Sequence, residues 1–288
     1  MKNVALKNNK AVAIDSGAME SGYHLKNGAN LKSQTSRGNI FKFFAAVLAA
    51  CIVLFGCGKD KDNGEVQLLE TTTYFNGSYI KNEYDNQNRI TKISWYDKDG
   101  KIGQTVTLIY SGDDLVKSET TGDKAGITEF VKNGNIITIT DKNESGTWSQ
   151  TYTIHLDSDG YPTKYENLGE SWSYVLTYTI QNGNLMQWTS KEVGYSTVYE
   201  NSANFIYDDK KSLFYYCNTP KWYMIYHYSE EGGRNNPIEQ SWDGGKLEYK
   251  YEYDSAGFPI KRTIIYDNEE SAEEKESTSV TTYEYTFK

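Results

Sequence analysis

Hydrophobic and polar residues alternate with a period of two along most of the chain after residue 65. In residues 174–180, tyrosine, leucine and isoleucine side chains fall on one face of the segment. In residues 249–253, three tyrosines share one face and two charged residues share the other. Because successive side chains of a β-strand point to opposite faces, this pattern predicts strands with one buried face.

Turn sequences separate these segments and recur about every 24 residues. A second series of turns lies between them, so each repeat of about 24 residues contains two strands. Asp-Gly, Asn-Gly and Asp-x-x-Gly sequences are typical of tight hairpins, since glycine adopts a positive φ at little cost. Loops this short cannot connect parallel strands. The chain therefore predicts an all-β, antiparallel up-and-down meander of roughly 16–18 strands. Since open sheets rarely exceed about 10 strands, the meander should be curled or closed into a barrel-like sheet.

Composition supports this fold class. Aromatic residues make up 14% of the chain, which has 25 Tyr, and only 4 of the 288 residues are Pro. Tyrosine, threonine and valine favour a pleated, half-buried surface over a helix. Residues 271–276 are the one segment with a helical pattern, and they are short enough to form a charged loop instead.

The N-terminal region predicts export. Residues 43–55 form an uncharged apolar run that follows Lys32, Arg37 and Lys42. The run is too short to span a bilayer, which takes about 20 residues, but it fits a secretory signal peptide with a basic flank. The 42 residues before it are long for such a flank, so translation is expected to start later, at Leu31 or Met19.

Leu54-Phe55-Gly56-Cys57 ends this run and resembles a bacterial lipobox. The resemblance implies cleavage before Cys57 and acylation of that cysteine, which would anchor the protein to outer-membrane lipid. We therefore expect residues 1–56 to be a signal peptide, residues 57–65 to be the lipidated Cys57 with a polar tether, and residues 66–288 to form a single repetitive β domain.

Two family resemblances concern the domain itself. The sequences Tyr84-Asp85 and Tyr96-Asp97, each followed by a turn and isoleucine, resemble the YD repeat of Rhs-type shell proteins. With the lipobox and residues 207–211 and 233–238, the chain is more similar to an uncharacterised family of exported bacterial lipoproteins, a domain of unknown function described as porin-like. That resemblance implies an outer-membrane lipoprotein on the cell surface or the periplasmic face. It implies no activity and no catalytic residues.

The net charge limits the classes of molecule that the exported part of the chain can bind, and the cysteine count limits its chemistry. Residues 1–56 hold seven of the 30 bases and two of the 39 acids, so 23 bases and 37 acids remain, a net charge of −14. Such a chain repels nucleic acid and anionic lipid. Cys217 is then the one cysteine left besides Cys57, and we interpret it as a small buried hydrophobic residue.

Reactive side chains form no recognisable catalytic or metal-binding pattern. His155 falls on a polar strand face, and His227 has no cysteine or histidine at ligand spacing. The sequences at residues 97–100 and 157–160 begin like calcium-binding loops of the helix–loop–helix type. Such a loop has a glutamate ligand at its twelfth residue, but that residue is Leu108 or Leu168 here, so hairpin turns are the better interpretation. We predict no cofactor and no enzymatic activity.

The six tryptophans are the candidate ligand-binding residues. Core packing is the favoured interpretation, since Trp95 shares a strand face with Ile93 and Trp222 with Met224. The alternative is an aromatic platform that stacks on a ligand. The set comprises Trp95, Trp148, Trp172, Trp188, Trp222 and Trp242.

Three functional hypotheses remain open. The first is a non-catalytic binding module of the cell envelope that takes a glycan, peptide or protein through aromatics on a sheet face or at a barrel mouth. The second is a structural shell or a pore-like β-barrel. The third is a glycan-processing hydrolase with paired carboxylates. Clustering of exposed Trp and Tyr would favour the first, and a polar lumen inside an apolar outer band would favour a pore.

Overall fold

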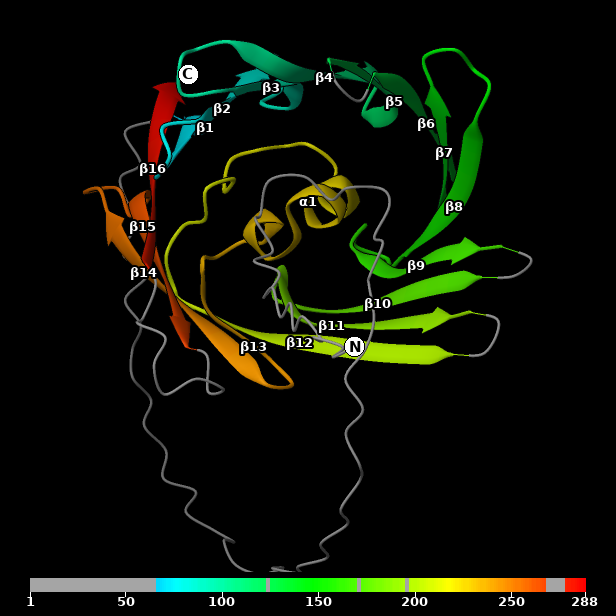
Figure 1. The fold of residues 1–288 in the computed structure, drawn as a ribbon. Coiled ribbons are helices and arrows are strands. Elements are labelled where there is room, and N and C mark those ends of the chain that lie inside the picture. The colour runs from blue at the N-terminus through cyan, green and yellow to red at the C-terminus, as the bar shows by residue number, and fades with distance from the viewer. Residues whose placement is uncertain (1–65, 123–124, 170–171, 195–196, 268–277) are drawn as a thin grey trace, which may run out of the picture. The chain divides into compact units, whose positions relative to one another are not determined.

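Sixteen antiparallel strands form a closed barrel in the computed structural model (Figure 1). The structure describes residues 66–122, 125–169, 172–194, 197–267 and 278–288. The strands are β1 (Gln67–Tyr74), β2 (Tyr79–Tyr84), β3 (Ile90–Tyr96), β4 (Ile102–Ser111), β5 (Asp114–Gly122), β6 (Gly126–Asn133), β7 (Ile136–Asn143), β8 (Ser149–Leu156), β9 (Pro162–Leu168), β10 (Ser173–Gln181), β11 (Asn184–Val193), β12 (Val198–Tyr207), β13 (Pro237–Trp242), β14 (Gly245–Tyr253), β15 (Pro259–Asp267) and β16 (Thr278–Phe287).

Pairing of the first and last strands closes the barrel. β1 runs antiparallel to β16, with Gln67 opposite Phe287. Val66 and Lys288 exchange two backbone hydrogen bonds of 2.9 and 3.0 Å just beyond these strands. Each strand otherwise pairs with its neighbours in sequence, so the up-and-down meander predicted from the turn signals is confirmed, and closure removes both free sheet edges.

The hairpin turns have the chemistry that the sequence predicts. The Asp157 carboxylate accepts backbone N–H groups of Asp159 and Tyr161, both at 2.9 Å, and Gly160 has φ 83°. Asp254 accepts the corresponding N–H groups at residues 256 and 258 in the β14–β15 turn. The aspartate therefore holds each of these turns, while the residue before it, Leu156 or Tyr253, is the last residue of the strand.

One long insert interrupts the meander between β12 and β13 and corrects the expectation that every element there is a strand. Residues 208–236, hereafter the insert, contain helix α1 (Lys221–Tyr228) and the 3-10 turn η1 (Ser229–Gly232). The helix lies inside the ring of strands (Figure 1). Four consecutive residues, 222–225, are buried. Four consecutive residues of a helix point in all directions around its axis, so the barrel interior surrounds this part of α1.

The insert packs against the inward-facing side chains of the barrel wall. The Phe130 ring on β6 lies 5.3 Å from the Trp222 ring and 6.1 Å from the Tyr223 ring, measured between centroids. Ile225 instead joins a second cluster that contains Leu185 and Phe205, on β11 and β12. The helix thus fills the space between separate parts of the wall.

Hydrogen bonds tie the insert to one end of the barrel. The Thr219 hydroxyl accepts the backbone N–H of Ile90 at 2.8 Å, and the Arg234 N–H donates to the Gly183 carbonyl at 3.1 Å. We call this end, which carries the β2–β3, β8–β9, β10–β11 and β14–β15 turns, the plugged end. The opposite end, with the β7–β8, β9–β10, β11–β12 and β13–β14 connections, is the open end.

A buried ion pair also joins the insert to the wall. Arg262 of β15 is 3% exposed, and its guanidinium contacts the carboxylate of Glu231 in η1. Glu230 beside it is buried as well. Burial, and then the negative charge of Glu231, raise the pKa of Glu230 above its usual range.

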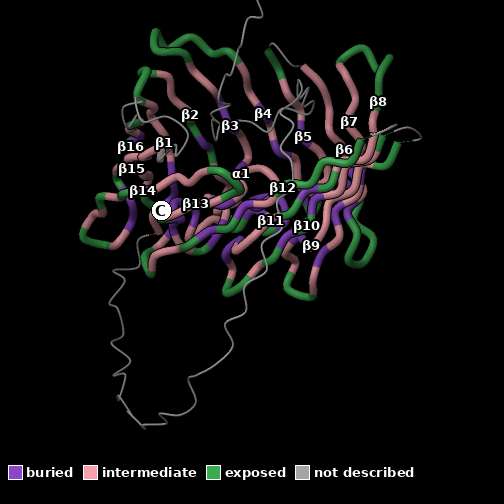
Figure 2. Tube along the Cα trace, turned by 60° about the horizontal axis from the view of Figure 1, so that its bottom comes forward, coloured by how far each residue is buried: buried purple, intermediate pink, exposed green. Residues whose placement is uncertain are grey.

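Ion pairs follow the outer wall, where strands meet solvent. They include Glu83–Lys92, Glu129–Lys142, Lys191–Glu200 and Glu252–Lys261, with N–O distances of 2.6–2.9 Å. On β10 the outward-facing Thr177 and Thr179 are exposed. Figure 2 shows buried residues along the strands and exposed residues gathered in the hairpins. Among the residues described, no helix combines the length and the apolar character that a membrane span requires.

Candidate functional site

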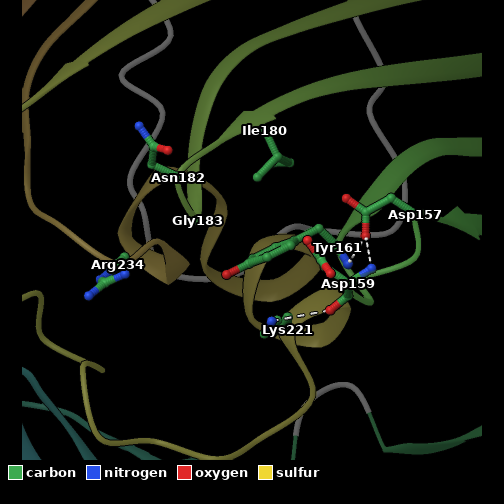
Figure 3. Close-up of a pocket in the computed structure, with 8 residues that line it drawn as sticks. All are labelled: Asp157, Asp159, Tyr161, Ile180, Asn182, Gly183, Lys221 and Arg234. Carbon is green, nitrogen blue, oxygen red and sulfur yellow. Dashed lines mark hydrogen bonds between the residues drawn. The ribbon is translucent and has the colours of Figure 1, made fainter.

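Two regions of the barrel offer surfaces to a ligand, and the first is a groove at the plugged end (Figure 3). It encloses about 360 Å³ between the β8–β9 turn, the β10–β11 turn and the insert. The Lys221 ammonium lies 4.5 Å from the centre of the Tyr161 ring and donates to the Asp159 carbonyl at 3.2 Å. Arg234 lies on the opposite side of the groove (Figure 3).

A second hollow of about 600 Å³ adjoins this groove and shares Asn182 and Arg234 with it. Its other polar groups hold the insert in place: the Asn184 side chain accepts the Asn235 N–H at 2.9 Å, and Asp208 accepts the Asn236 N–H at 3.1 Å. None of the six tryptophans lines either hollow. The groove is therefore built largely of groups that fasten the insert.

The second region is the inner wall at the open end. Tyr174 of β10 pairs with Glu192 of β11, which in turn pairs with Tyr199 of β12. Tyr174 packs against the core cluster that contains Leu176, so this row of side chains faces inward. Tyr199 nevertheless is 52% exposed. Residues 198–202 of β12 extend beyond the end of β13, so Tyr199 stands at the rim of the barrel, where solvent reaches it.

Two tryptophans share this inward face. Trp172 is 37% exposed, stacks parallel to Tyr174 with 6.2 Å between ring centroids, and donates its indole N–H to the Glu192 carboxylate at 2.7 Å. Trp242 of β13 is 39% exposed and pairs with the buried Ala203. We call Trp172, Tyr199 and Trp242 the mouth aromatics. Tyr199 and Trp242 belong to strands, and Trp172 lies in the β9–β10 connection directly before β10.

Glycine positions one of these rings. Gly245 pairs with Trp242 across the β13–β14 hairpin, and a Cβ atom at residue 245 would lie 2.7 Å from the indole Cζ2. The indole therefore lies directly over the Gly245 backbone, where a side chain would displace it.

Polar side chains lie between the mouth aromatics. One register row deeper than Tyr199, Asn201 of β12 pairs with Ser190 of β11 on the same inward face. Together with Glu192 they offer an amide, a hydroxyl and a carboxylate. Further along the wall, on β6 and β7, the Asp141 carboxylate accepts the Thr128 hydroxyl at 2.6 Å, and burial raises the pKa of Asp141.

The six tryptophans selected from the sequence divide into two groups. Trp222 is buried on α1, not on a strand as expected, while Trp95 and Trp188 pack against the two core clusters. Trp148, Trp172 and Trp242 are exposed and all lie at the open end. Sequence reasoning missed Tyr199, Glu192 and Gly245, because only the register places them beside the tryptophans.

The remaining candidate residues occupy structural positions, or fall outside the described part of the chain. Cys57 and residues 271–276 lie outside it. His155 is on the outer wall, 2.7 Å from Glu166. Cys217 packs against the larger core cluster, and burial raises its pKa. No group of three metal-ligating side chains occurs among the residues that the structure describes.

The fold and the site thus define a closed antiparallel barrel that encloses a helix of its own chain and exposes aromatic side chains inside one mouth. This is the barrel architecture of the second sequence hypothesis, the pore-like one. No protein-family model and no curated protein matches the chain.

Among solved structures, the chain is similar to a porin-like protein from Bacteroides uniformis, with 15% identity, a TM-score of 0.35, and coverage of 75% of this chain and 96% of that one. It is also similar to a structure described as TcdB2-TccC3-TEV, with 14% identity, a TM-score of 0.30, and coverage of 75% of this chain and 14% of that one. Likeness at this level says nothing about the function of the chain.

Proposed function

We propose that this protein is a non-catalytic, plugged barrel that binds a ligand at its open end. The observation that carries the proposal is an asymmetry between the two ends. Inward-facing side chains near the plugged end, such as Ile90 and Leu185, are fully buried beneath the insert. The mouth aromatics face the same interior but remain between 37% and 52% exposed. Large aromatic side chains left accessible on a rigid wall are a common feature of binding sites.

Barrel closure supports the pore-like alternative, and two other observations weigh against conduction through a membrane. The insert packs apolar side chains such as Trp222 and Tyr223 into the interior, so the barrel does not hold an empty polar lumen. The outer wall carries ion pairs where a membrane barrel has an apolar band, and a lysine at the bilayer midplane costs about 2–4 kcal/mol. We therefore propose that the outer wall faces water.

We also propose the lipid anchor at Cys57 and an outer-membrane location. The support comes from the lipobox-like residues 54–57 and from the position of Val66, which pairs with Lys288 at the plugged end. Eight residues lie between Cys57 and Val66, so the chain can span at most about 30 Å from one to the other. An anchor there would hold the plugged end near the membrane and turn the open end away from it.

The test uses the mature chain from Cys57 onward, titrated in a calorimeter with glycans, peptides and neighbouring envelope proteins. We expect a ligand whose binding is lost in Trp242→Ala and retained in Arg234→Ala, since Arg234 lines the groove at the other end. Loss of binding in Arg234→Ala alone would move the site to that groove and contradict the proposal. Turnover of a ligand, abolished by changing one carboxylate, would support the hydrolase hypothesis instead.

A further inference from the structure

We infer that the ligand of the open end is a neutral carbohydrate chain, an inference that rests on the proposed function. The first argument is the spacing of the mouth aromatics. Tyr199 and Ala203 lie four residues apart on β12, which corresponds to about 13 Å. Trp242 pairs with Ala203, so aromatic rings stand at both ends of that distance along the inner wall. Pyranose rings have flat apolar faces, and such separated rings suit a chain of them rather than one small molecule.

The second argument is the alternation of ring and polar groups. Asn201 lies between Tyr199 and Ala203 on β12, and it pairs with Ser190 on β11. Glu192 lies one row nearer the mouth and pairs with Tyr199. Sugars present hydroxyl groups around the edge of each apolar face, so they need donors and acceptors beside every stacking surface. Amide, hydroxyl and carboxylate side chains supply both.

Pre-organisation is the third argument. Trp172 is fixed by its stacking on Tyr174 and by its hydrogen bond to Glu192. Trp242 is fixed over Gly245. Because these rings are already ordered, a ligand that stacks on them loses little additional side-chain entropy.

The competing ligand classes fit this wall less well. A peptide that adds a strand needs an unpaired sheet edge, and the edge at this mouth is short: residues 198–202 of β12, which extend beyond the end of β13. An amphipathic helix needs a continuous aliphatic groove, whereas aromatic and polar side chains alternate here. Anionic polymers, nucleic acid included, are repelled by Glu192 at the mouth and by a net charge of −14 after residue 56.

The experiment titrates the mature chain with neutral hexasaccharides built of glucose, mannose or galactose, followed by calorimetry and by intrinsic tryptophan fluorescence. A hexamer of galacturonate and a six-residue neutral peptide serve as comparison probes. We expect at least one neutral hexasaccharide to bind more tightly than about 1 mM, to shift the tryptophan emission, and to bind at least tenfold more tightly than the charged hexamer.

Variants locate that binding. Trp172→Ala and Trp242→Ala should each weaken it at least tenfold, and Trp172→Phe should restore part of the loss because phenylalanine still stacks. Gly245→Ala should weaken it as well, since the new Cβ displaces the Trp242 indole while every polar group stays. The controls are Phe287→Ala, an exposed aromatic at the plugged end, and Arg234→Ala at the same end; both should leave affinity within threefold. Near-ultraviolet circular dichroism confirms that each variant is folded.

The outcomes separate the two proposals. Absence of binding to every neutral hexasaccharide, or binding that Trp172→Ala and Trp242→Ala leave unchanged, overturns the carbohydrate inference. Peptide binding that these two variants abolish also overturns it but supports ligand binding at the open end. Binding of any probe that only Arg234→Ala abolishes contradicts both.

Discussion

Removing the charge of Arg262 tests how the insert is held inside the barrel. Arg262 is 3% exposed on the inner face of β15, and its guanidinium contacts the Glu231 carboxylate and lies 5.7 Å from the centre of the Tyr249 ring. In Arg262→Met the side chain keeps most of its length and apolar contact but loses its charge. The Glu231 carboxylate then remains between the wall and the insert without its cation.

The expected cost follows from this burial. Removing one partner of a buried ion pair typically costs about 3–5 kcal/mol, because the remaining charge is desolvated without compensation. Glu230 adds to this cost, since it is buried beside Glu231 with a pKa that burial and Glu231 already raise. Against a total stability of about 5–15 kcal/mol for a domain, the loss would be large.

Urea unfolding of the mature chain measures the effect, with Glu231→Gln and the double variant completing a cycle. We expect the double variant to recover at least about 2 kcal/mol relative to the sum of the single changes. Lys261→Met is the matched control. Lys261 is the adjacent residue, pairs with Glu252 at 2.6 Å on the outer wall, and should cost less than about 1 kcal/mol. Additive single costs, or an Arg262→Met loss no greater than that of Lys261→Met, would refute this account of the insert.

Three further results are expected. Burial lowers the pKa of His227 from 6.5 to about 4. Between these pH values the unfolded chain binds a proton that the folded chain does not, so the free energy of unfolding should decrease as pH falls from 6.5 towards 4, by at most about 3 kcal/mol. His227→Gln should flatten this slope in urea unfolding at several pH values, whereas His155→Gln on the outer wall should not. Cys57→Ser should abolish palmitate labelling and release the protein from membranes, and labelling that persists would exclude this anchor. The Cys57→Ser chain, secreted without detergent, should be monomeric and folded by size exclusion and circular dichroism; recovery in detergent alone would favour a membrane-embedded barrel.

Local patterns in the sequence determine the strands, the turns and the side chains that face inward. The inward set in residues 174–180 was predictable because alternation is a property of each strand alone. Asp157 and Gly160 likewise identify a tight turn without reference to the rest of the molecule. The strand number of sixteen agrees with the predicted range because each turn signal marks one reversal of the chain.

Contacts between distant residues decided everything else. Alternation and turns say nothing about whether the first strand meets the last, and β1 pairs with β16 across some 200 residues. The helix α1 is only eight residues long and holds a run of apolar and aromatic residues, so from sequence it cannot be told from a buried strand; the barrel interior decides the outcome. Of the six tryptophans, three are part of the core and three are exposed at the open end. Whether a tryptophan is buried or exposed depends on the register of its strand and on which end of the barrel the insert fills. Both depend on contacts between residues that are far apart in the sequence.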